Sequence, residues 1–261
     1  MSFDFKQPVT AYELIAIIIS MVALAAPILK WLHNKFIRRI RFDFLPSSSI
    51  TLYHNKSGSY LSLGGVYESK NKAATVKDVS VIVTRRSDNA NLSLNWSTFP
   101  SPVFRKVAGN FETSFETAHP IKVEADSLTP MFVEFSNSDE NINEISESIL
   151  QPISSVSYSI LSQPNIQVKI ADSQLKQTDE YQNAKISLND YFFWKPGKYD
   201  LSLITEYNNS KLIKKYEFEL TTDESGRLRN NIDNILVEHV ATFFRLNLSI
   251  STVKKDFNEI K

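Results

Sequence analysis

Hydrophobic residues are distributed in two ways along the chain, as one continuous run near the start and as short alternating runs afterwards. Residues 14–29, LIAIIISMVALAAPIL, carry no charge. At about 1.5 Å of rise per residue a helix of this length spans roughly 24 Å, and its neighbours extend it to the ~30 Å of a bilayer core. A helix that is apolar on every face has no stripe with which to pack on a soluble core. The pattern predicts a transmembrane helix over residues 11–32, with a buried core helix as the alternative.

The charges after this helix predict its orientation. The segment KWLHNKFIRRIR contains five Lys or Arg residues, and cationic residues close to a span tend to stay in the cytoplasm. We therefore expect a single-pass protein of a bacterial inner membrane, with a short extracytoplasmic tail at residues 1–10, a basic juxtamembrane linker at residues 33–46 and a cytoplasmic body. The side chains expected to contact membrane lipids at the interface are Tyr12, Lys30, Trp31, Lys35, Arg38, Arg39 and Arg41. A topology signal is the favoured role of the basic residues, and recognition of anionic head groups is the alternative.

Small residues in the apolar run leave two further possibilities open. Ala23-Leu24-Ala25 matches the small-x-small pattern of a cleaved secretory signal. A secretory signal requires basic residues before its apolar run, and this chain does not have them there, so a retained anchor is favoured. Ala16 and Ser20 lie four positions apart and permit close helix packing. They predict a homo-oligomer formed through the membrane helix.

The body of the chain alternates with the period of a half-buried strand. Leu92, Leu94 and Trp96, for example, are separated by polar residues. The regular spacing of such runs favours a mainly β protein, an immunoglobulin-like antiparallel β-sandwich over residues 47–222. Gly64-Gly65 indicates a bulge or a close approach of the backbone.

The second half of the predicted sandwich contains further strands and one type II turn. Strands are expected at residues 166–170, 184–188 and 191–194. The turn Lys195-Pro196-Gly197-Lys198 would join the last of these to a strand beginning at Tyr199.

Helical spacing occurs in two places in the body. Residues 139–150, DENINEISESIL, begin with acidic residues and carry isoleucines on one face, which predicts a helical insertion between strands. Residues 223–261 predict a C-terminal helix and strand that pack on the sandwich. Pairing of this last strand with another chain is the alternative.

Composition excludes several classes of chemistry. The chain has no cysteine, and its formal net charge is zero, so disulfides, thiolate metal sites and a nucleic-acid partner are not expected. It has no phosphate-binding glycine loop and no Gly-x-Ser-x-Gly elbow. The four histidines, expected to be isolated at the surface or half-buried, are His33, His54, His119 and His239. We predict no metal, no cofactor and no catalytic residues, and we expect Trp96 and Trp194 in the core.

These features favour a non-enzymatic, membrane-anchored protein whose cytoplasmic β domain binds a protein partner as a scaffold. A first alternative is an oligomeric membrane effector or sensor subunit, as in bacterial stress or phage defence. A second is an exported β-sandwich that hydrolyses or binds carbohydrate, which requires the reverse topology.

Overall fold

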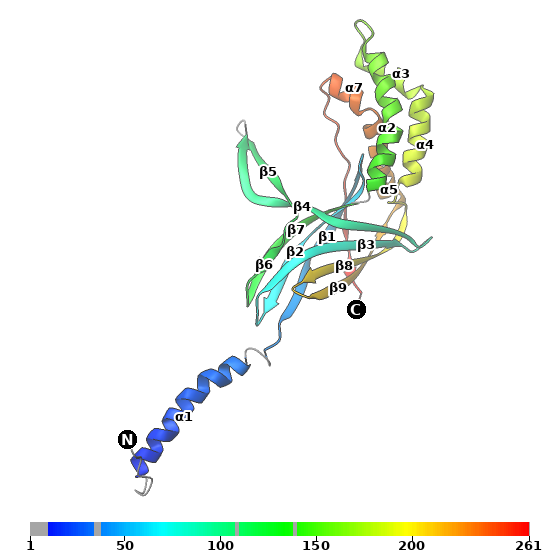
Figure 1. Ribbon diagram of the computed structural model, residues 1–261. Helices are drawn as coiled ribbons and strands as arrows, with labels where there is room; N and C mark the ends of the chain where they lie inside the picture. The colour runs from blue at the N-terminus through cyan, green and yellow to red at the C-terminus, as the bar shows by residue number, and fades with distance from the viewer. Residues whose placement is uncertain (1–9, 34–37, 108–109, 138–139, 261) are drawn as a thin grey trace.

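The computed structural model describes residues 10–33, 38–107, 110–137 and 140–260. The chain forms an isolated N-terminal helix, an antiparallel β-barrel and a group of helices at the far end of the barrel (Figure 1).

The N-terminal helix α1 (Ala11–Leu32) extends away from the rest of the molecule, and none of its residues is buried. A capping box begins it, because the Thr10 side chain accepts a hydrogen bond from the Glu13 amide while the Glu13 carboxylate bonds the Thr10 backbone. Its mean hydropathy reaches 2.2, and in the described part of the chain no other helix is long and apolar enough to cross a membrane. Its length and composition suit a single membrane span or a signal sequence.

The strands of the body form one antiparallel sheet that curls into a barrel. Along the barrel wall the order is β10-β1-β2-β7-β4-β3-β8-β9-β11, while β5 pairs only with β4 and β6 only with β3. The bounds are β1 Arg41–Asn55, β2 Gly58–Lys70, β3 Ala74–Arg85, β4 Ala90–Val107, β5 Asn110–Thr117, β6 Ile121–Val123, β7 Ser127–Ser136, β8 Gly197–Tyr207, β9 Ser210–Leu220, β10 Val253–Asp256 and β11 Asn258–Glu259.

The C-terminal segment brings the two ends of this sheet together. β10 pairs with β1, with Ile50 opposite Lys255, and β11 pairs with β9, with Tyr216 opposite Glu259. Lys214 adds ion pairs to Asp43 on β1 at 2.9 Å and to Glu259 at 3.0 Å. The sheet is therefore nearly closed, and the predicted immunoglobulin-like sandwich is wrong. Alternation shows that one face of each strand is buried, but it is the same for two stacked sheets and for one sheet rolled on itself.

The barrel interior is filled by large side chains from every side of the wall. Tyr67, Phe135, Tyr199 and Tyr216 are fully buried. The Tyr67 hydroxyl is 2.8 Å from the Thr205 hydroxyl on the other side of the interior, so its polar end has a partner despite burial.

Six of the described helices, α2 to α7, lie at the end of the barrel opposite α1 (Figure 1). Three lie between β7 and β8, namely α2 Glu140–Leu161, α3 Val168–Lys176 and α4 Asp179–Tyr191. Three lie between β9 and β10, namely α5 Thr222–Arg229, α6 Asn231–Leu236 and α7 Glu238–Phe243. α2 packs against α3, α4 and α7, while α5 and α6 contact β1. The helix predicted at residues 139–150 is present as α2, which continues through Pro152.

Three strands expected in this region are wrong. Residues 184–188 lie inside α4, residues 168–170 begin α3, and residues 192–194 form a connection without strand structure. Five-residue apolar runs fit a strand and a helix equally well, and here the caps decide: the Thr178 side chain accepts from the Tyr181 amide and starts α4. The Pro-Gly turn does not join two strands, because Gly197 (φ 138°) opens β8, whose partners are β3 and β9.

The C-terminal strand also differs from its expected position. The alternating residues 246–250 have no regular structure, and the strand begins at Val253. It pairs with β1 of the same chain.

Candidate functional site

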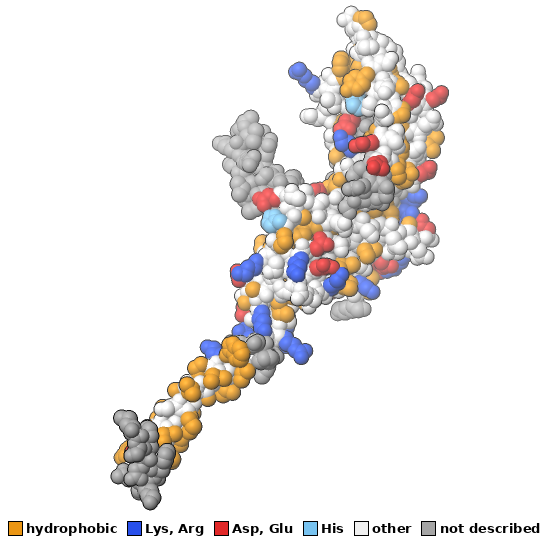
Figure 2. Space-filling model, in the orientation of Figure 1, with side chains coloured by type: hydrophobic (Ala, Val, Ile, Leu, Met, Phe, Trp, Pro, Cys, Tyr) orange, Lys and Arg blue, Asp and Glu red, His pale blue; other side chains and the backbone are white. Residues whose placement is uncertain are grey.

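Of the residues predicted to contact the membrane, three lie on α1, and the others follow it in the sequence. Tyr12, Lys30 and Trp31 are exposed on α1. Figure 2 shows apolar side chains over the visible face of this helix and basic side chains gathered where it meets the barrel. Lys35 lies outside the described residues. Arg39 is exposed, and Arg41 is the first residue of β1, opposite Lys70. Contact of these residues with lipid stays a prediction.

Arg38 has a role that the sequence did not indicate. Its Nε donates to Asn71 Oδ1 at 3.1 Å, and its Nη2 lies 3.3 Å from Asp126 Oδ2. Asn71 in turn donates to the Arg39 carbonyl oxygen at 2.8 Å. These contacts attach the segment after α1 to two turns at the near end of the barrel.

The two small residues proposed for helix packing lie on an open face of α1. The Ser20 hydroxyl donates to the Ala16 carbonyl oxygen at 2.8 Å, so this polar group has its hydrogen-bond partner within the helix. A homo-oligomer formed through this face stays a prediction.

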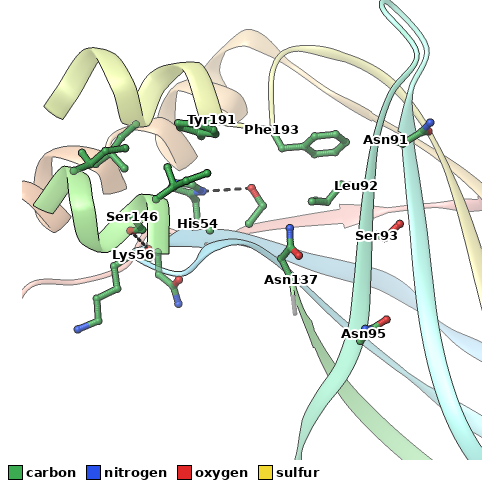
Figure 3. Close-up of a pocket in the computed structure, with 16 residues that line it drawn as sticks. His54, Lys56, Asn91, Leu92, Ser93, Asn95, Asn137, Ser146, Tyr191 and Phe193 are labelled. Atoms are coloured by element: carbon green, nitrogen blue, oxygen red, sulfur yellow. Dashed lines mark hydrogen bonds between the residues drawn. The ribbon is translucent and has the colours of Figure 1, made fainter. Parts of the chain in front are cut away.

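A cavity lies at the far end of the barrel, between the barrel wall and the helices; it is more enclosed than the larger hollow beside it, and we call it the principal cavity. It has a volume of about 540 Å³, within the range of small-ligand and peptide side-chain pockets. It is lined by His54, Asn55, Lys56, Gly58, Ser59, Asn91, Leu92, Ser93, Asn95, Asn137, Ile145, Ser146, Ile149, Leu188, Tyr191 and Phe193. Figure 3 shows β4 on one side of this cavity and the helices, with His54 and Lys56, on the other. Most of the lining is amide, hydroxyl or apolar.

His54 is a buried residue of this lining, which corrects the expectation of surface or half-buried histidines. Its exposed fraction is 4%. Its Nδ1 is 3.3 Å from the Ser59 hydroxyl, and its ring packs edge-on against Phe192. Burial lowers the pKa of His54 to about 4, so the imidazole is neutral at pH 7. The alternation along β1 could have predicted this burial, because His54 follows Ile50 and Leu52 at intervals of two residues and so lies on the same inward face.

Lys56 is the one charged residue among the described residues that line the cavity. Its Nζ lies 3.4 Å from Glu238 Oε1 on α7, and its carbonyl oxygen accepts from the Ser146 hydroxyl on α2 at 2.5 Å. It also lines two neighbouring hollows of about 320 and 950 Å³. The turn between β1 and β2 thus contacts both α2 and α7.

Ser154 and His239 form a second polar pair, on the outer side of the helices. The Ser154 hydroxyl is 2.7 Å from His239 Nε2, and it also lies 3.1 Å from the Leu150 carbonyl oxygen of its own helix. In the described part of the chain no carboxylate bonds the other nitrogen of His239, so the pair lacks the third member of a catalytic triad. The described residues also contain no cluster of three His, Asp or Glu that could hold a metal.

The two remaining histidines lie apart from the cavity. His33 caps the end of α1, and His119 is exposed. Trp96 and Trp194 are buried, as predicted. The Trp194 indole donates to the Tyr53 carbonyl oxygen at 3.0 Å, which fixes the chain after α4 onto the barrel.

Comparison with models of protein families, with curated proteins and with solved structures finds nothing that matches this chain.

Proposed function

We propose that this chain is a membrane-tethered, non-enzymatic binding protein whose barrel lies in the cytoplasm and whose helical end receives a protein partner. The observation that supports the proposal is that the apolar helix and the cavity lie at opposite ends of the molecule. The apolar α1 leaves one end of the barrel, and the helices cover the opposite end (Figure 1). The principal cavity lies between these helices and the barrel wall.

This arrangement of the two ends suits recruitment of a partner to a membrane surface. A partner that reached the helical end would not compete with the bilayer for the same surface. Confinement to a membrane also raises the effective concentration of both proteins, so a modest interface suffices. The basic residues that follow α1 support a cytoplasmic location of the body.

The lining of the cavity supports binding rather than catalysis. Paired carboxylates are missing from the described lining, and its histidine is held neutral in a site where only Ser59 is its hydrogen-bond partner. General acid–base chemistry needs groups whose pKa lies near the working pH, and a histidine with a pKa of about 4 does not provide one.

Topology is tested by cysteine labelling, which is clean because the chain has no cysteine of its own. Ser2→Cys and Ser210→Cys are expressed separately in a bacterial host and treated with a membrane-impermeant maleimide. We expect Ser2→Cys to react in intact cells and Ser210→Cys to react only after the inner membrane is opened. Labelling of Ser210→Cys in intact cells, or loss of residue 2 from the mature protein, would contradict the anchored cytoplasmic topology.

Binding is tested with a photo-crosslinking residue at one of two exposed positions. Tyr191 borders the cavity, and Lys211 follows the turn between β8 and β9, away from it. A single partner should crosslink from position 191 and not from position 211. Equal crosslinking from both positions, or none from position 191 in the native host, would contradict a partner site at the helical end.

A further inference from the structure

The barrel wall contains a gap at its helical end, because β7 is shorter than its two neighbours. β7 ends at Ser136, which is opposite Asn95 on β4, and its pairing with β2 stops where Phe135 meets Leu61. β2 and β4 both continue beyond these points. Residues 58–60 of β2 then pair only with β1, and residues 91–94 of β4 pair only with β3. In the described part of the chain no strand occupies the other side of either segment.

We call this gap the notch and define it by residues 58–60 and 91–94. Lower in the barrel β7 fills the position between β2 and β4. Because neighbouring strands are about 4.8 Å apart, the two free edges of the notch leave room for one strand. The principal cavity occupies the same place, since its lining includes Gly58 and Ser59 from one edge and Asn91, Leu92 and Ser93 from the other (Figure 3).

We propose that the notch binds an extended peptide segment of the partner protein, which adds to the free edge of β4 as a strand. This inference rests on the proposed function and specifies how the partner is recognised. A strand edge presents a row of backbone N–H and C=O groups, and the backbone of one more strand is their natural complement. A segment of about five residues is long enough to pair with residues 91–94.

The lining of the cavity determines which peptides fit. Alternate side chains of an added strand point to opposite faces. On the inner face they would meet apolar residues of the helices, Ile145, Ile149 and Leu188. On the outer face they would lie beside the exposed Asn91 and Ser93. Lys56 already pairs with Glu238 at 3.4 Å, and the described lining contains no carboxylate, so a buried Lys or Arg of the peptide would have no counter-ion there. The structure therefore favours a segment that alternates apolar with uncharged polar residues.

The test uses peptides selected from a phage-displayed library of random decapeptides, with the full chain in lipid nanodiscs as bait. Amide hydrogen exchange is measured with and without a selected peptide. We expect exchange to slow by about tenfold or more at those amides of residues 91–94 that do not bond β3, because strand addition forms hydrogen bonds to them. A side-chain contact alone would leave them unchanged.

Two tryptophan variants provide the matched comparison. Ile145→Trp places a large side chain in the cavity, whereas Ile186→Trp lies on an exposed part of α4 outside it. We expect Ile145→Trp to weaken peptide binding about tenfold or more and Ile186→Trp to change it less than about twofold. Unchanged exchange in the rest of the barrel shows that both variants are folded.

Three results would overturn the inference. The first is that the selected peptides bind without slowing exchange in residues 91–94, and the second is that they bind Ile145→Trp as well as the original chain. Alternatively, exchange in residues 91–94 of the free protein slows with rising protein concentration, which would make a second copy of the chain the occupant. If position 191 still crosslinks a partner while residues 91–94 exchange freely, this inference fails and the proposed function stands.

Discussion

Gly65 lies on β2 beside the Phe44 side chain and the backbone of β1. A Cβ atom added there would overlap the Phe44 ring and approach the Leu45 carbonyl oxygen to 2.7 Å. Phe44 is buried against Tyr67, and the carbonyl belongs to the backbone of β1, so neither group moves easily. Gly65→Ala should therefore destabilise the barrel.

The neighbouring glycine provides a control with the same chemistry. A Cβ atom on Gly64 would lie 2.7 Å from the Phe132 ring. Phe132 is 59% exposed, so its ring can turn away into solvent. Neither glycine has a positive φ, and the difference between the two positions is therefore one of space alone.

The expected magnitudes follow from overpacking and from backbone entropy. Overpacking a dense core costs about 1–3 kcal/mol, and replacing a strand glycine by alanine returns about 0.5–1 kcal/mol. With a rigid neighbour on each side, we expect Gly65→Ala to lower the free energy of unfolding by about 2 kcal/mol. Gly64→Ala should change it by less than about 1 kcal/mol.

Urea unfolding of the full chain in detergent, followed by tryptophan fluorescence, measures both variants. With an m-value of about 2 kcal/mol per molar urea, the Gly65→Ala midpoint should fall by about 1 M at unchanged m. The two buried tryptophans Trp96 and Trp194 report on the barrel. The packing argument is refuted if Gly65→Ala is as stable as the original chain, or if Gly64→Ala is the less stable of the two.

Two further predictions concern the buried histidine and the closure of the barrel. Burial holds the pKa of His54 near 4 in the folded protein. Between about pH 6.5 and pH 4 the unfolded chain therefore binds more protons than the folded one. The contribution of His54 to the free energy of unfolding should be complete above pH 6.5, and the free energy should fall by up to about 3 kcal/mol toward pH 4. Urea titrations at several pH values measure this slope, and His54→Gln should flatten it; an unchanged slope in that variant would assign it to other groups. Val253→Asp places a charge at a position that is 1% exposed on β10, and we expect faster amide exchange in residues 49–52 and 216–217, which pair with β10 and β11. Lys254→Asp, on an exposed position of the same strand, is its control, and equal effects of the two variants would contradict a closing role for this segment.

The sequence predicts α1 well because a long uncharged run has few structural solutions. It predicts strands but not their assembly, since the pairing of β10 with β1 joins residues from opposite ends of the chain and leaves no local pattern. Sheet closure depends on such distant pairings, and alternation is a local property. The alternation of apolar and polar residues could therefore not distinguish a barrel from a sandwich.

Some errors concern signals that the sequence does contain. Thr178 followed by Asp179 and Glu180 is a helix start, and it precedes the residues that we expected to form a strand at 184–188. The inward position of His54 on β1 could also have been predicted from the sequence. The notch could not, because it arises from the relative lengths of β2, β4 and β7, which only the strand register reveals.

The seam formed by β10 and β11 has a consequence for biosynthesis. Among the described elements translation produces α1 first and this seam last, so the barrel cannot close before β10 and β11 have left the ribosome. During that interval the outer edges of β1 and β9 stay available to other polypeptides beside the membrane, where pairing errors lead to aggregation. The Ile260 amide bonds the Lys215 carbonyl oxygen at 2.8 Å, so an affinity tag joined directly at this end would lie against the seam, and a flexible spacer is the safer design.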